Sequence, residues 1–62
     1  MSTPSVSVWL HEGSLVTVNL PEGDARCEFL RWPFRRHGRL DIYVDDCIVA
    51  HLTRVTGWRY NP

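Results

Sequence analysis

The sequence predicts an all-β protein, a small meander of five antiparallel strands that curls into a barrel. Three observations favour this class. Apolar and polar residues alternate with a period of two in several segments, turn-forming Gly, Pro and Asp residues separate those segments, and β-branched residues are frequent. A sheet of this size must curl or pack against something to cover its apolar face.

Two strands are expected near the N-terminus, after a loose, polar end at residues 1–4. The first begins at Ser5 and the second covers Leu15–Leu20, with Glu12-Gly13 as a two-residue turn between them, so the pair predicts a hairpin. The alternation points Trp9 outward. The residues expected to face the core are Val6, Val8, Leu10, Val16, Val18 and Leu20.

The third segment, Arg26–Trp32, has two interpretations. Asp24 could cap a short helix, but Pro33 would stop that helix after barely two turns, so a strand is favoured. Pro33–Gly38 is expected to form a loop in which Gly38 lets the chain turn back. A fourth strand follows, with Leu40, Ile42 and Val44 inward and Asp41 and Tyr43 outward.

Asp45-Asp46 suits a hairpin turn because Asp tolerates the left-handed conformation. The last element, from Cys47 to about Val55, fits both a strand with Ile48, Ala50 and Leu52 on one face and a capped helix. Its β-branched residues favour the strand. An aromatic tail, Trp58–Tyr60, is expected to follow.

Three stretches carry a family resemblance: Leu15-Val-Thr-Val-Asn-Leu-Pro-Glu-Gly23, Gly38-Arg-Leu-Asp-Ile-Tyr-Val44 and His51-Leu-Thr-Arg-Val-Thr-Gly57. Together they resemble the order of strands and turns in Sm-like and SH3-like small barrels, over roughly two thirds of the chain. The resemblance implies a barrel that binds RNA, DNA or peptides, often as a ring or a pair. The chain has no recognisable N-terminal helix and carries an arginine-rich loop, which argues against a ring-shaped RNA-binding role.

The chain has 62 residues, enough for one domain, expected at residues 5–60. A domain this small buries only about 60% of its unfolded surface, so further stabilisation is expected. A disulfide between Cys27 and Cys47, a metal or a partner could supply it, and a homo-oligomer is the first expectation.

Composition indicates an ordinary soluble protein, with 44% hydrophobic and 23% charged residues. The longest apolar runs are far too short to span a bilayer, and the first residues lack the pattern of a secretory signal. The cytoplasm is therefore the expected location, with both cysteines reduced and no membrane partner.

The main chemical signal is a cluster of arginines and aromatic residues without any acidic residue. Its candidate nucleic-acid-binding residues are Arg31, Trp32, Phe34, Arg35, Arg36 and Arg39. Arginine neutralises phosphate and flat side chains stack on bases, so the cluster favours nucleic-acid binding. In the alternative interpretation, Trp32 and Phe34 plug one end of the barrel and the arginines form its solvated rim.

A second set of candidates, Trp9, Tyr43 and Trp58, has the composition of a protein-binding surface. They suit a small regulatory or inhibitory protein, of the kind that mobile elements encode, which blocks a larger host protein. Alternatively, Trp58 folds back to close the core.

Enzyme activity, a metal and a cofactor are not expected. Cys27, Cys47, His37 and His51 have no metal-ligand spacing, and no third group is visible that would orient a catalytic Cys–His pair. The sequence thus predicts a small non-enzymatic binding module. Nucleic acid is the first partner, a host protein the second, and a structural role in a larger assembly the third.

Overall fold

The computed structural model describes residues 3–62, and in that range it contains strands and no helix. The strands are β1 (Ser5–Leu10), β2 (Leu15–Asn19), β3 (Ala25–Arg31), β4 (Gly38–Val44) and β5 (Cys47–Asn61). All neighbours are antiparallel, in the order β2-β1-β5-β4-β3. The prediction of five antiparallel strands is confirmed, including the strand interpretation of the third and fifth segments. The predicted meander order is wrong, because β1 pairs with β5 and, among the described residues, β2 does not pair with β3.

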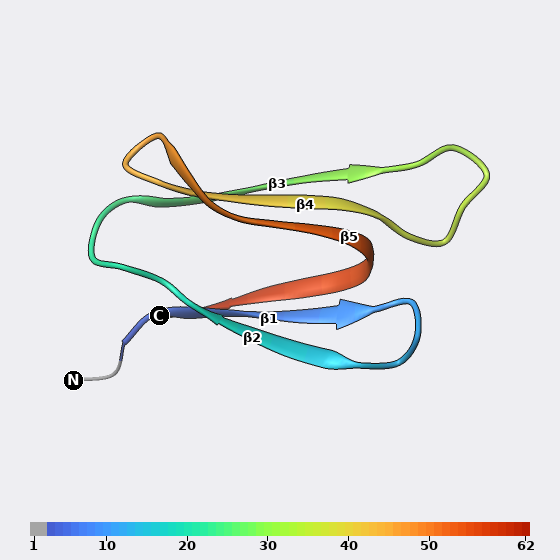
Figure 1. The fold of residues 1–62 in the computed structure, drawn as a ribbon, viewed down its shortest axis with the longest axis horizontal. Coiled ribbons are helices and arrows are strands. Elements are labelled where there is room, and N and C mark those ends of the chain that lie inside the picture. Colours follow the sequence, from blue (N-terminus) through green and yellow to red (C-terminus); the bar gives the residue numbers. More distant parts are fainter. Residues whose placement is uncertain (1–2) are drawn as a thin grey trace.

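A sharp bend in β5 folds the sheet into two layers (Figure 1). Val55 pairs with Gly38 of β4 and also with Leu10 of β1, so β5 leaves one layer and enters the other at this residue. The register shifts on both sides of the bend, and Arg54 has a left-handed φ of 58°. Such bulges increase the bending of a strand. Figure 1 shows β3, β4 and the first part of β5 as one layer, and β1, β2 and the end of β5 as the other.

The core lies between the layers and is apolar. In the described residues, its buried side chains are Val6, Val8, Leu20, Leu40, Ile42, Val44 and Val55. These belong to the set that the alternation pointed inward, with Val55 added at the bend. Each buried side chain of this kind stabilises the fold by about 1.5–3 kcal/mol.

The sheet is not a closed barrel. In the described residues β2 and β3 are the two outer strands and do not pair with one another. The chain between them crosses from one layer to the other (Figure 1). Asp24 fixes this crossing to the β4–β5 turn, since its N–H donates to Asp45 Oδ1 and its carbonyl accepts from Asp45 N–H, each at 3.0 Å. Asp45 and Asp46 have the expected left-handed conformation.

Several predicted boundaries were wrong. The β1–β2 loop spans residues 11–14 rather than two residues. The last strand does not end near Val55, because Trp58–Tyr60 continue β5 and pair with β1. Ile48 does not share a face with Ala50, because a register shift places it opposite Tyr43, 56% exposed.

Gly38 has a different role from the one expected. It lies in β4 rather than in the turn, and a Cβ there would collide with the backbone of Leu30 and Arg31. Close approach of two strands therefore requires this glycine. The expected loose end at residues 1–4 lies partly outside the described residues, and Pro4 O accepts a 2.9 Å hydrogen bond from Leu20 N–H. Residues 3–62 contain no helix of the length and apolarity that a membrane crossing requires.

Candidate functional site

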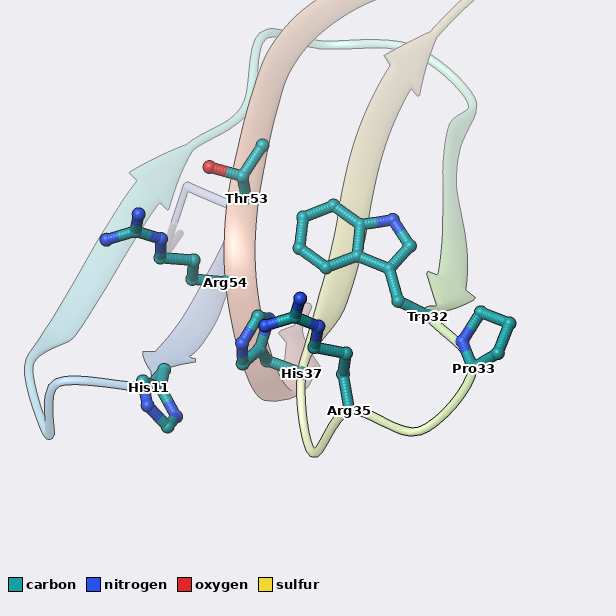
Figure 2. Close-up of a pocket in the computed structure, with 7 residues that line it drawn as sticks. All are labelled: His11, Trp32, Pro33, Arg35, His37, Thr53 and Arg54. Carbon is teal, nitrogen blue, oxygen red and sulfur yellow. The ribbon is translucent and has the colours of Figure 1, made fainter.

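A groove opens at the end of the molecule where the β1–β2 loop and the β3–β4 loop meet the bend of β5 (Figure 2). Its volume is about 780 Å³. The lining residues come from three separate parts of the chain: His11, Trp32, Pro33, Arg35, His37, Thr53 and Arg54. The fold thus assembles the groove from both layers.

The β3–β4 loop forms one wall. Pro33 has no N–H to donate and lies two residues after the end of β3 at Arg31. Arg35 N–H donates to Trp32 O at 3.3 Å, and Trp32 N–H donates to His37 O at 3.4 Å. Phe34 completes the turn with a φ of 59°. These bonds present Trp32 and Arg35 together at the groove.

The β5 bend and the β1–β2 loop form the opposite wall. His11 N–H donates to Arg54 O at 2.7 Å, which ties the loop to the bend. Figure 2 shows Trp32 and Arg54 on opposite sides of His37. Sequence reasoning did not find His11, Thr53 or Arg54, because their place in the groove depends on the bend rather than on any local pattern.

His37 contacts aromatic rings from both walls of the groove. Its ring centroid lies 4.8 Å from that of His11 and 5.3 Å from that of Trp32, and the rings of His37 and Trp32 are nearly perpendicular, at 80°. Nδ1 of His37 is buried and has no hydrogen-bond partner among the described residues. Burial lowers the pKa of His37 below its usual value, and the positive charges of His11, Arg35 and Arg54 lower it further.

The charge of the groove is one-sided. Two guanidinium groups and two imidazoles line it, and none of its described lining residues is acidic. Glu12 lines an adjoining depression of about 330 Å³ that shares His11, Thr53 and Arg54 with the groove. A groove with this lining suits an anion with a flat, apolar part.

No protein-family model, curated protein or solved structure matches this chain.

The predicted arginine cluster divides into groups. Trp32 and Arg35 line the groove, whereas Arg31, Phe34 and Arg36 are exposed beside it. Phe34 is fully exposed at the tip of the loop. Arg39 lies on the outer face of β4.

Among the described residues, the acidic side chains neutralise only one member of the cluster. Arg39 Nε lies 3.3 Å from Asp41 Oδ2, and Asp41 Oδ1 also contacts His51 Nδ1 at 2.5 Å. Two other acidic residues, Glu28 and Asp46, contact Arg26 instead. The guanidinium groups of the loop therefore remain available.

The predicted protein-binding aromatics do not form one surface. Trp9 of β1 pairs with Gly57 of β5. Trp58, which follows Gly57, pairs with the buried Val8 and so lies on the core-facing side. Since neighbouring residues of a strand point to opposite faces, Trp9 and Trp58 lie on opposite faces. Tyr43 lies on the outer face of the other layer, with the Arg26 guanidinium 4.7 Å from its ring centre.

The weighed metal ligands do not converge. Within residues 3–62, no three His, Cys, Asp or Glu side chains form a group suited to a metal ion. Cys27 and Cys47 are free thiols, with Cys47 exposed and Cys27 half-buried.

Proposed function

We propose that this protein is a small non-enzymatic module that binds nucleic acid through the groove. The observation that carries the proposal is the lining itself: Trp32 lies in one groove with Arg35 and Arg54, without an acidic residue among the described lining. Phosphates would bind the two guanidinium groups, and an unpaired base would stack on the indole. Exposed Arg31, Phe34 and Arg36 would extend the contact along the strand.

Arg39 is expected to contribute less than the other arginines. Its guanidinium is held by Asp41, so a phosphate would have to compete with that carboxylate. The proposed interface therefore consists of the groove and the tip of the loop.

Binding of a fluorescent single-stranded oligonucleotide, followed by anisotropy, tests the proposal. We expect affinity to fall steeply with salt, because cations released from the phosphates drive binding. The double change Arg35→Gln/Arg36→Gln should weaken all sequences together, and Arg54→Gln should also weaken binding although it lies outside the loop. Trp32→Leu should cost roughly 1–3 kcal/mol of binding free energy through lost stacking.

Arg59→Gln is the matched control, because it removes an exposed arginine on the outer face of β5. It should leave affinity nearly unchanged. Binding that ignores salt, or an Arg59→Gln effect equal to that of Arg35→Gln, would reject the proposal.

The second candidate partner is a host protein. It is favoured by the neighbouring Trp9 and Leu15, which pair across β1 and β2 and are 42% and 58% exposed. Tyr43 and Trp58 would then belong to separate contacts. A pull-down after nuclease treatment distinguishes the two candidates, since a partner retained without nucleic acid and lost in Trp9→Ala favours the host protein.

We also propose that the fold is related to SH3-like and Sm-like barrels, which is supported by the single bent sheet around one core. We propose a cytoplasmic location, which the two free thiols support, and a homo-oligomeric state.

A further inference from the structure

We propose that the outer edge of β2 pairs with the same edge of a second copy, antiparallel and centred on Thr17. The β2 edge lies outside the groove and shares none of its lining residues, so self-association there does not depend on nucleic-acid binding.

Two hydrogen bonds fix which backbone groups of β2 face outward. Leu20 N–H donates to Pro4 O and Leu10 N–H donates to Ser14 O, each at 2.9 Å. Hydrogen-bonded and non-hydrogen-bonded pairs alternate along an antiparallel ladder. Counting from either bond, the pairs Val6/Val18 and Val8/Val16 are the hydrogen-bonded ones. Val16 and Val18 therefore bond to β1, which leaves the N–H and C=O groups of Leu15, Thr17 and Asn19 pointing outward.

The β2 edge lacks the features that prevent strands from associating. Its sequence, LVTVN, has no charge and no proline, and its register with β1 has no bulge. Exposed edges are normally protected by charged residues, proline or bulges. The other edge, β3, has such protection, because it carries Arg26, Glu28 and Arg31.

A two-fold axis at Thr17 satisfies every outward group. Thr17 then pairs with Thr17 of the second copy, and Leu15 with Asn19 of the second copy. Leu15, Thr17 and Asn19 of each copy are then all in hydrogen-bonded pairs. A register shifted by two residues would leave one of these residues in each copy without a partner. The half-buried Val16 lies against Val18 of the second copy, so the core-facing side becomes continuous. Gly13 and Pro21 limit the pairing to the strand.

The first test is the mass of the full chain across a concentration series, by light scattering or sedimentation. We expect twice the 7.2 kDa of one chain at high concentration. Thr17→Pro should weaken association by roughly 30-fold or more, because it removes both central hydrogen bonds. It should still fold, since proline is tolerated where an edge N–H faces solvent.

Ala25→Pro is the matched control on the other edge. Asp45 N–H donates to Asp24 O, so Asp24 and Asp45 form a hydrogen-bonded pair. Because such pairs alternate along the ladder, the next residue, Ala25, does not bond to β4 and its N–H points outward. Ala25→Pro should leave the association intact. A chain that stays monomeric at all concentrations, or one in which Ala25→Pro abolishes association and Thr17→Pro does not, would overturn the proposal.

A second test reads the register directly and does not depend on proline. In a Cys27→Ala/Cys47→Ala background, Thr17→Cys places two thiols at about 5.5 Å between Cα atoms, within disulfide range. Asn19→Cys places its two thiols roughly 14 Å apart, beyond that range. In a glutathione redox buffer we expect Thr17→Cys to form a cross-linked dimer and Asn19→Cys to stay monomeric, and the reverse order or equal cross-linking would contradict the register.

Discussion

The imidazole rings of His11 and His37 lie 4.8 Å apart and are tilted by 55°. His11 lies in the β1–β2 loop and His37 in the β3–β4 loop, so this contact joins the two layers at the groove. Because His11, Arg35 and Arg54 all surround His37, protonation of its ring adds a charge beside other positive charges. The protonation of His37 therefore depends on the positive charges around it.

The first prediction is that His37 titrates below its usual value of 6.5. Nuclear magnetic resonance of the ring Hε1 proton measures the midpoint. Added salt and Arg54→Gln should each raise it, because they weaken the repulsion between positive charges. A nucleic acid in the groove should raise it as well.

The same pKa links stability to pH. The unfolded chain binds a proton at His37 more readily than the folded chain, so protonation of His37 favours unfolding. The contribution of neutral His37 to the free energy of unfolding is therefore full above pH 6.5 and is lost as pH falls below that value. Urea unfolding at several pH values should show this loss, and His37→Gln should reduce it. A midpoint at or above 6.5 would contradict the prediction.

The second prediction compares two glycines within strands. Gly38→Ala should lower the free energy of unfolding by about 2 kcal/mol or more, because its Cβ would collide with the backbone of Leu30 and Arg31. At Gly57 a Cβ would meet no atom within 4 Å. Gly57→Ala should therefore change the unfolding free energy by less than about 1 kcal/mol in urea titrations. Equal losses at both positions would show that the close approach to Leu30 and Arg31 does not set the requirement for glycine at position 38.

Alternation predicted most of the core because it is a local property. Val6, Val8 and Leu40 point inward for reasons that lie within their own strands, and the two turn aspartates are equally local. The bend of β5 was not predictable in this way. It depends on Val55 pairing with two strands at once and on Arg54 adopting a conformation that non-glycine residues rarely take.

The groove shows the same division between local and distant information. Trp32 and Arg35 were predicted together because they are neighbours in one loop. His11 and Arg54 reach the groove only after the sheet folds over, so no spacing in the sequence indicates them. The contact between Arg39 and Asp41 is local by contrast, because the two residues are two positions apart on the outward face that the alternation predicts.

The third prediction concerns Val55, the fully buried residue at the bend. Val55→Ala should lower the free energy of unfolding by about 2 kcal/mol, through lost burial and the cavity that remains. In a domain whose core supplies roughly 3–5 kcal/mol, this is a large fraction of the total. Val49→Ala, at a position 41% exposed in the same strand, is the control and should cost clearly less. Similar losses in thermal unfolding would argue against a central role of the bend.

The fourth prediction separates the two thiols. Burial raises the pKa of Cys27 above 9.0, so at neutral pH it forms little of the reactive thiolate, whereas Cys47 is exposed. Reaction with a thiol-specific disulfide reagent should therefore show two phases, and Cys27→Ser should remove only the slow one. Since the pKa of Cys27 is raised in the folded chain, its contribution to stability is present below pH 9.0 and is lost as pH rises above that value. Two equally fast thiols in the folded protein would show that the β3 edge opens more readily than the packing of Cys27 against the core implies.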